Sequence, residues 1–167
     1  MASNKTAIVT GASQGIGAAV AQAFLGRGYN VVATSRSVSK AGFAPSPNLA
    51  LVDGDIGQAA TAADVAQTAI SKFGSIDTLV NNAGVFLVKP FTDYTAEDFR
   101  SLVSTNLEGF FFITQLAVTQ MLSQGTGGSV TSRRSLWGMF PTEGHGSIFH
   151  RGLARTLDGP RGGRIRC

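Results

Sequence analysis

Cysteine is almost absent from the 167-residue chain, since Cys167 is its only one, and long apolar runs are missing altogether. A single cysteine cannot form an intramolecular disulfide, which favours a reducing compartment. No apolar run approaches the roughly 18 residues that a membrane-spanning helix requires. The sequence enters a β-type segment at Thr6 without the charged and apolar regions of a signal peptide. We therefore expect a soluble, cytoplasmic protein with no membrane partner.

Histidine is also scarce, and the two histidines, His145 and His150, lie five positions apart with no cluster of further ligands near them. This spacing does not place both side chains on one face of a helix, and a metal site needs several converging ligands. We therefore expect no metal site.

Charged residues make up only 14% of the chain, and they are unevenly distributed. Residues 1–130 carry seven Lys or Arg and eight Asp or Glu, for a net charge of −1, whereas residues 131–167 carry seven Arg and two acids, for +5. The basic excess thus lies in an Arg- and Gly-rich tail. Such a tail can bind phosphates without specificity, but its aromatic residues do not alternate with basic ones. We expect poor order rather than a nucleic-acid-binding arm.

Short, partly β-branched apolar runs alternate with amphipathic stretches along the first 130 residues. The expected strands cover residues 6–10, 30–35, 49–53, 78–82 and 129–132. The expected helices are one that buries Ile16, Val20, Ala23 and Phe24, a second that ends at Gly74, and a long third that opens with a capping box at Thr95 and runs to about Gln124. This alternation predicts an α/β fold, a Rossmann-like doubly wound parallel sheet truncated after about five strands. Ligands of such sheets bind outside the carboxyl ends of the strands.

A glycine-rich loop follows the first expected strand, where residues 10–17 read TGASQGIG. Its glycines let the backbone turn tightly and approach a pyrophosphate, while the N-terminus of the next helix supplies free N–H groups and the positive end of a dipole. Ser13 adds a hydroxyl donor. An ordinary glycine-rich turn is the alternative, but the position between a strand and a helix favours phosphate binding.

The spacing G-x-x-x-G-x-G resembles the glycine motif of the short-chain dehydrogenase/reductase family, and three further motifs match in order. They are Asp55-Ile56 after the third strand, Asn81-Asn82-Ala83-Gly84 after the fourth, and Asn106 in the long helix. Asp55 could instead be only a turn former or helix cap, and Asn81 and Asn82 could only satisfy backbone groups at a strand end. Asn106 is unfavourable inside a helix by propensity, which calls for a reason. Together the motifs mark residues 1–130 as resembling the dinucleotide-binding domain of the family. The cofactor-binding residues that this resemblance implies are Gly11, Ser13, Gln14, Gly15, Ile16, Gly17, Ser35, Arg36, Asp55, Ile56, Asn82, Ala83 and Gly84.

The end of the second expected strand distinguishes NAD from NADP, because a carboxylate there binds the ribose 2′-hydroxyl and repels a 2′-phosphate. This strand ends at Ser35 and Arg36, with no acid. Arg36 can bind a 2′-phosphate through a charge-assisted fork of hydrogen bonds, although a solvated surface arginine is the alternative. We expect NADP to be preferred over NAD.

The resemblance implies hydride transfer between NADP(H) and a carbonyl or alcohol substrate, with a Ser that orients the carbonyl, a Tyr that donates the proton and a Lys four residues after the Tyr. Asn106 and Ser135 occupy catalytic positions by this resemblance. The Tyr-x-x-x-Lys pattern is missing, because the only tyrosines are Tyr29 and Tyr94 and the last lysine is Lys89. Neither histidine has a basic residue four positions on, so neither replaces the pair. We expect turnover far below that of an intact family member, or none.

Residues 131–167 also look aberrant as part of such a fold. Arg133 and Arg134 fall where a buried strand should be apolar, and burial of guanidinium groups without partners costs several kcal/mol per ion. We interpret the tail as out-of-phase or aberrantly spliced translation, which the other two reading frames of the coding nucleotides would test.

Three functions therefore stay open: an NADP-dependent oxidoreductase, a catalytically inactive dinucleotide-binding module, and a truncated product without stable function. The resemblance also implies a homo-oligomer through the long helix at residues 95–124. It does not indicate the substrate, because the segments that build the substrate pocket in the family have no match here.

Overall fold

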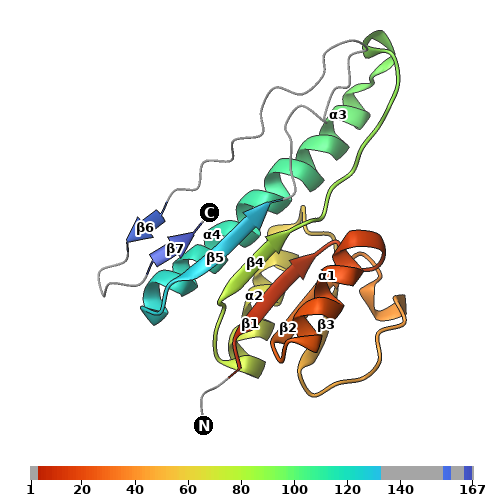
Figure 1. Cartoon of the computed structure of the whole chain (residues 1–167). Helices are drawn as coiled ribbons and strands as arrows, with labels where there is room; N and C mark the ends of the chain where they lie inside the picture. Colours follow the sequence, from red (N-terminus) through yellow and green to blue (C-terminus); the bar gives the residue numbers. More distant parts are fainter. Residues whose placement is uncertain (1–3, 133–155, 159–163, 167) are drawn as a thin grey trace.

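A parallel sheet with helices on both faces forms the body of the fold, as the computed structural model of the chain shows (Figure 1). The structure describes residues 4–132, 156–158 and 164–166. Five parallel strands lie in the order β3-β2-β1-β4-β5. They are β1 (Thr6–Thr10), β2 (Asn30–Ser35), β3 (Leu49–Asp53), β4 (Thr78–Asn81) and β5 (Gly128–Ser132). The predicted α/β fold is confirmed, and each expected strand is present to within one residue at either end.

Two three-residue strands extend this sheet beyond β5. β7 (Arg164–Arg166) pairs with β5 in parallel, and β6 (Thr156–Asp158) pairs with β7 in the antiparallel direction. The sheet therefore contains two strands more than the five that we expected. Arg133 and Arg134 lie outside the described residues, so the division of the chain near residue 130 stays a prediction.

Helices cover the two faces of the sheet unequally within the described part of the chain. One face carries α1 (Gly15–Gly26) and the short 3-10 turn η1 (Val38–Lys40), while α2 (Ala59–Phe73) and α4 (Gly109–Gln124) pack side by side on the other. The helix expected at residues 95–124 is divided into α3 (Ala96–Val103), a π-helical turn η3 (Ser104–Glu108) and α4. The predicted capping box at Thr95 is confirmed, with Asp98 as its partner.

The core consists of two apolar layers, one on each face of the sheet. Ile8 and Leu79 are fully buried beneath α2 and α4 together with Ile113, whereas Val9 and Val31 are fully buried beneath α1. Each such side chain contributes roughly 1.5–3 kcal/mol by leaving water. Burial on both faces is the reason that the strands are nearly continuous apolar runs rather than alternating ones.

The buried face of α1 matches the predicted one in part. Val20 and Phe24 pack against the apolar layer as predicted, whereas Ile16 and Ala23 are exposed and the buried residues of the helix are Gly17 and Ala21. A Cβ on Gly17 would lie 2.2 Å from the carbonyl oxygen of Gly11. The helix thus approaches the glycine loop too closely for a large side chain, which the apolar periodicity does not reveal.

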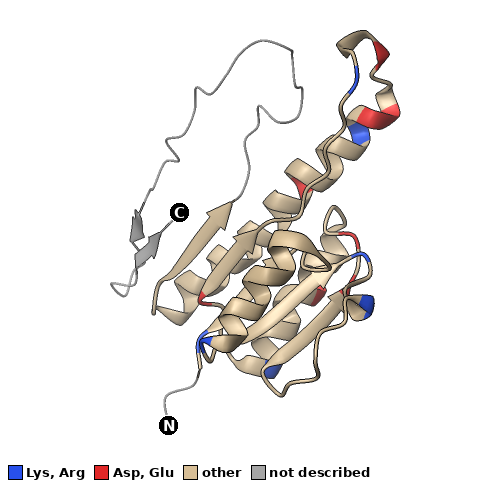
Figure 2. Cartoon of the chain, turned by 45° about the vertical axis from the view of Figure 1, so that its right-hand side comes forward, with Lys and Arg blue, Asp and Glu red and all other residues tan. Residues whose placement is uncertain are grey.

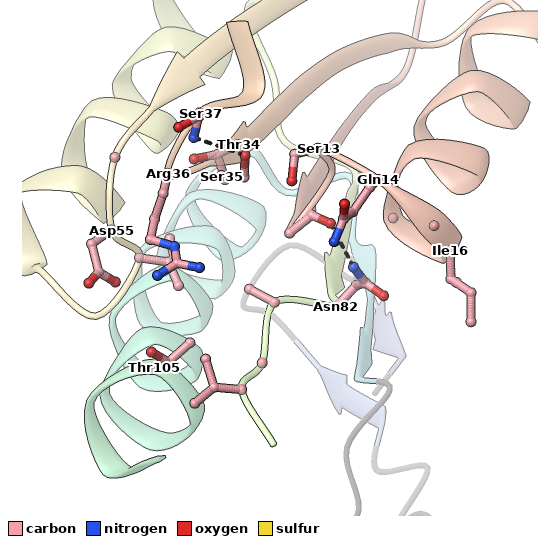
Figure 3. Close-up of a pocket in the computed structure, with 18 residues that line it drawn as sticks. Ser13, Gln14, Ile16, Thr34, Ser35, Arg36, Ser37, Asp55, Asn82 and Thr105 are labelled. Atoms are coloured by element: carbon pink, nitrogen blue, oxygen red, sulfur yellow. Dashed lines mark hydrogen bonds between the residues drawn. The ribbon is translucent and has the colours of Figure 1, made fainter. Parts of the chain in front are cut away.

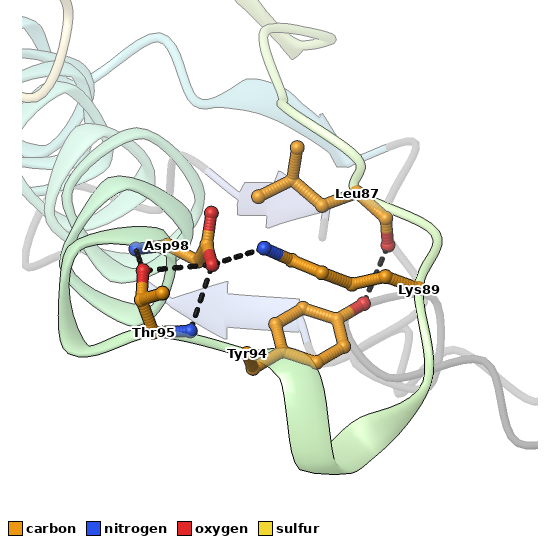
Figure 4. A network of polar contacts seen from close by, with 5 residues as sticks. All are labelled: Leu87, Lys89, Tyr94, Thr95 and Asp98. Atoms are coloured by element: carbon orange, nitrogen blue, oxygen red, sulfur yellow. Dashed lines mark hydrogen bonds and ion pairs between the residues drawn. The ribbon is translucent and has the colours of Figure 1, made fainter.

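A polar network fixes the segment that runs from β4 to the start of α3, and it includes η2 (Phe91–Asp93). The Tyr94 hydroxyl donates to the carbonyl of Leu87 (2.6 Å), and Lys89 forms an ion pair with Asp98 (Figure 4). The Lys89 ammonium also lies 5.4 Å from the centroid of the Tyr94 ring. Tyr94 and Lys89 are therefore engaged in contacts with each other, Leu87 and Asp98 near the start of α3.

Lysine, arginine and acidic positions are scattered over the described fold rather than gathered on one face (Figure 2). None of the helices in this part of the chain combines the length and the apolar character that crossing a membrane requires. The same residues contain no group of three or more His, Cys, Asp or Glu arranged to hold a metal ion.

Candidate functional site

A cleft of about 450 Å³ opens at the carboxyl ends of β1, β2 and β4 (Figure 3). It is lined by Gly11, Ser13, Gln14, Gly15, Ile16, Gly17, Thr34, Ser35, Arg36, Ser37, Gly54, Asp55, Ile56, Asn82, Ala83, Gly84, Val85 and Thr105. The structure therefore brings together every residue that the sequence proposed for cofactor binding. The sequence did not propose the other lining residues. Thr34, Ser37, Gly54 and Val85 lie at or after strand ends, and Thr105 comes from the π-helical turn next to Asn106.

The glycine loop gives the cleft its wall beside α1. Gly11 and Gly15 have φ values of 65° and 57°, which other residues rarely adopt. α1 begins at Gly15, and neither a side-chain cap from Gln14 nor an acid in the first turn occupies its N-terminus. The first N–H groups of a helix have no partner within it, so they present positive charge to the cleft. This wall suits the pyrophosphate of a dinucleotide.

Asn82 joins the glycine loop to the end of β4. Its side-chain amide donates to the carbonyls of Thr10 (3.0 Å) and Gly11 (3.1 Å). The Thr10 hydroxyl in turn accepts from the backbone N–H groups of Asn82 (3.1 Å) and Ala83 (3.0 Å). These contacts match the bracing expected of the asparagine motif, and they hold two walls of the cleft in a fixed relation.

Asn106 lies beneath the cleft and does not line it. The residue is 4% exposed, and its side chain accepts from the N–H of Val85 (3.0 Å) and donates to the carbonyl of Val85 (2.9 Å). Both ends of the amide therefore hold the backbone that follows Gly84. The contacts of this side chain are those of a positioning residue, and its catalytic role stays a prediction. Ser135, the other predicted catalytic residue, lies outside the described residues.

The end of β2 forms the opposite wall. Arg36 is exposed and extends over the cleft (Figure 3), and within the described residues it takes part in no ion pair. Asp55, in the loop after β3, accepts a hydrogen bond from the N–H of Gly57 (3.0 Å), so it forms the turn that its plainer reading suggested while it also lines the cleft. The cleft thus has a free cation at one end and a helix N-terminus at the other.

The parallel sheet and the cleft at its carboxyl edge define a Rossmann-like nucleotide-binding fold. The family described as short chain dehydrogenase matches residues 5–146. The chain therefore belongs to the short-chain dehydrogenase family, whose members are NAD(P)-dependent oxidoreductases. The matched range continues past residue 130 and includes Ser135.

Individual relatives show the same likeness over part of their length. An NADP-dependent (R)-specific alcohol dehydrogenase of Lentilactobacillus kefiri is 35% identical over 139 residues, which cover 80% of this chain and 55% of that protein. An L-rhamnose 1-dehydrogenase (NAD(P)(+)) of Azotobacter vinelandii is 39% identical over 144 residues, with coverages of 80% and 56%.

A solved short-chain dehydrogenase from Streptomyces avermitilis superposes with a TM-score of 0.72 at 31% identity, covering 79% of this chain and 49% of that one. The chain spans about half the length of the relatives that it matches.

Proposed function

We propose that this chain binds NADP(H) in the cleft and is the cofactor-binding part of an oxidoreductase that transfers hydride between NADP(H) and a small carbonyl or alcohol substrate. The supporting observation is that an uncapped helix N-terminus and the guanidinium of Arg36, which has no ion pair among the described residues, lie across one cleft from each other. The name of the Lentilactobacillus kefiri relative agrees with NADP, whereas the name of the Azotobacter vinelandii relative includes both dinucleotides.

The residues of the cleft fit the parts of NADP(H). The N–H groups at the start of α1 would bind the pyrophosphate, and Arg36 with the Ser37 hydroxyl would bind the 2′-phosphate. Asp55 and Ile56 would contact the adenine, and Asn82 keeps the glycine loop open to the phosphates. When bound, the nicotinamide supplies the hydride, and the protein supplies its orientation.

The described part of the cleft contains no tyrosine or lysine that could supply a proton. Tyr29 packs on Phe24, with 5.0 Å between the ring centroids, and Tyr94 donates to Leu87. These observations favour a second candidate function, a dinucleotide-binding module without turnover.

A titration of the full chain with NADPH, followed by the fluorescence of the reduced nicotinamide, tests the binding, and a reductase assay with simple ketones and aldehydes tests the turnover. Saturable binding with no turnover supports the module. Binding with turnover at ordinary enzyme rates supports the oxidoreductase in this chain itself. Aggregation with neither signal contradicts both proposals.

We further propose that copies of the chain associate through residues 95–124. Phe99, Leu107, Phe110 and Phe111 on this long helix are 36–56% exposed. Exposed apolar side chains in such number mark an interaction surface more often than a free one. Sedimentation of the wild-type chain and of the Phe111→Ser variant tests this association. If both sediment as monomers of equal size, the association is refuted.

We also propose a cytoplasmic location, since a lone cysteine suits a reducing compartment. Cell fractionation checks it.

A further inference from the structure

We propose that Asp53 and Ser39 are positioning residues for the 2′-phosphate of the dinucleotide, because together they fix the turn that carries Arg36. Since this role rests on the proposed binding of NADP(H), it concerns the preference for NADPH over NADH rather than binding as such. Neither residue lines the cleft, and no motif of the sequence includes them.

The carboxylate of Asp53 spans the distance between β3 and the turn after β2. Asp53 ends β3 directly opposite Ser35, its partner in the parallel ladder, and Gly54 donates its N–H to the carbonyl of Ser35 (3.0 Å). One carboxylate oxygen accepts from the backbone N–H of Ser39 (2.8 Å), and the other accepts from the Ser39 hydroxyl. Both oxygens of Asp53 are therefore engaged by a single residue of η1.

The turn has a second anchor on its opposite side. Val38 is fully buried in the apolar layer beneath α1, next to Ser39 in the chain. Ser37 donates its N–H to the Ser35 hydroxyl oxygen (3.3 Å), and Lys40 donates its N–H to the carbonyl of Ser37 (3.2 Å). The backbone is thus held immediately before Arg36 and again two residues after it.

Arg36 itself contributes nothing to this anchoring. Its side chain is exposed and has no ion pair among the described residues, so its guanidinium is available to a ligand. A guanidinium that binds a phosphate through two parallel hydrogen bonds needs a backbone that is held in place, because both bonds require the same narrow range of geometry. The Asp53–Ser39 contact holds the backbone of the turn that carries Arg36.

The same contact holds a competing acceptor against the protein. A carboxylate beside the end of β2 is the group that binds a ribose 2′-hydroxyl in NAD-preferring sites and repels a 2′-phosphate. Here Ser39 donates to both oxygens, and its side-chain and backbone hydrogen bonds lower the pKa of Asp53, which shows that they favour the ionised carboxylate. The acid is retained as a brace while its acceptor oxygens are turned to the protein.

Substitutions at Asp53 separate bracing from charge, because the two effects have opposite signs. Asp53→Ala removes both the brace and a negative charge, and loss of charge alone would strengthen the binding of a 2′-phosphate. We expect instead that NADPH binds about tenfold more weakly to Asp53→Ala, the loss that one charge-assisted hydrogen bond represents, with NADH affinity changed less than about twofold. Asp53→Asn keeps an acceptor for the Ser39 N–H and a partner for the Ser39 hydroxyl, so it should bind NADPH at least as tightly as the wild type.

The measurement is a fluorescence titration of the full chain with NADPH and with NADH, repeated as a competition by 2′-AMP and by 5′-AMP. Ser39→Ala, which keeps the backbone hydrogen bond, should lower the NADPH affinity by a smaller factor than Asp53→Ala. Asp64→Ala removes an exposed acid of α2 and serves as the matched control. Circular dichroism checks that each variant is folded. If Asp53→Ala does not fold, the NADPH affinity of Ser39→Ala tests the proposed role in its place.

Unchanged or tighter NADPH binding by Asp53→Ala would overturn the proposed role. So would an equal loss of NADPH and NADH, because that result shows a general structural effect without selectivity for the phosphate. A wild-type chain that binds neither dinucleotide overturns the proposed function itself, and this role with it.

Discussion

Thr10 and Thr34 are partners in the ladder between β1 and β2 and are equally buried, but only one of them has its hydroxyl satisfied. The Thr10 hydroxyl accepts from two backbone N–H groups and donates to the carbonyl of Val80 (3.4 Å). The Thr34 hydroxyl oxygen has no hydrogen-bond partner among the described residues. Two identical side chains at equivalent strand ends are thus in opposite hydrogen-bonding states within the described part of the chain.

Replacement of each threonine by valine should therefore change stability in opposite directions. We expect Thr34→Val to raise the free energy of unfolding by about 1 kcal/mol, because a buried hydroxyl without a partner is removed. Thr10→Val should lower it by about 1–3 kcal/mol, because the N–H of Ala83 loses its acceptor and the N–H of Asn82 keeps only the Val80 carbonyl. Urea unfolding followed by circular dichroism measures both, and a change of the same sign in the two variants would contradict the assignment.

Gly17 and Gly26 belong to the same helix and provide a matched pair for the glycine loop. A Cβ on Gly17 would lie 2.2 Å from the Gly11 carbonyl oxygen and 2.5 Å from the Asn82 side-chain nitrogen, whereas a Cβ on Gly26 would meet nothing within 4 Å. We expect Gly17→Ala to displace the loop and to abolish measurable NADPH binding. Gly26→Ala should bind normally and be slightly more stable, since alanine favours a helix by up to about 1 kcal/mol over glycine.

Fluorescence titration and thermal unfolding of both variants check this pair. Normal NADPH binding by Gly17→Ala would show that the close packing of α1 on the glycine loop does not shape the site.

The strands could be predicted from the sequence because their signal is local. β1, β2 and β3 have the predicted limits, since each is a short, largely apolar run between turn residues. β1 and β2 are also buried on both faces, whereas the edge strand β3 is partly exposed. The helices were harder, because their faces depend on what they pack against. On α1 the apolar periodicity selects Val20 and Phe24 correctly, but it also selects the exposed Ile16 and misses the buried Gly17.

The site was predictable only as far as its motifs extend. The glycine loop and the asparagine motif identify themselves by spacing, so their residues could be assigned to one cleft before the structure was known. The contact between Asp53 and Ser39 joins positions 14 apart through a turn whose geometry has no sequence signature. The π-helical turn that buries Asn106 against Val85 likewise interrupts a periodicity that reads as one continuous helix.

Arg36 should decide the preference between the two dinucleotides. We expect Arg36→Ala to weaken NADPH binding by about tenfold or more, the value of a charge-assisted phosphate contact, while NADH binding changes little. The NADPH affinity of the wild type should also fall with added salt more steeply than that of the variant. Arg27→Ala, an exposed arginine at the opposite end of α1, is the control. Equal losses for NADPH and NADH in Arg36→Ala would contradict the assignment of the 2′-phosphate to this residue.

Asp98 should make the stability of the protein fall in acid. The hydrogen bond from Lys89, followed by those from Thr95, lowers the pKa of Asp98 to about 2 in the folded chain. A carboxyl with a depressed folded pKa stabilises the fold fully above its unfolded pKa, and this stabilisation is lost as the pH falls toward the folded value. We expect Asp98→Asn to show a shallower decrease in the free energy of unfolding between about pH 4 and about pH 2 than the wild type does. Asp64→Asn, an exposed acid outside this network, should retain the wild-type slope, and an unchanged slope in Asp98→Asn would mean that the ion pair with Lys89 does not hold the segment before α3 in solution.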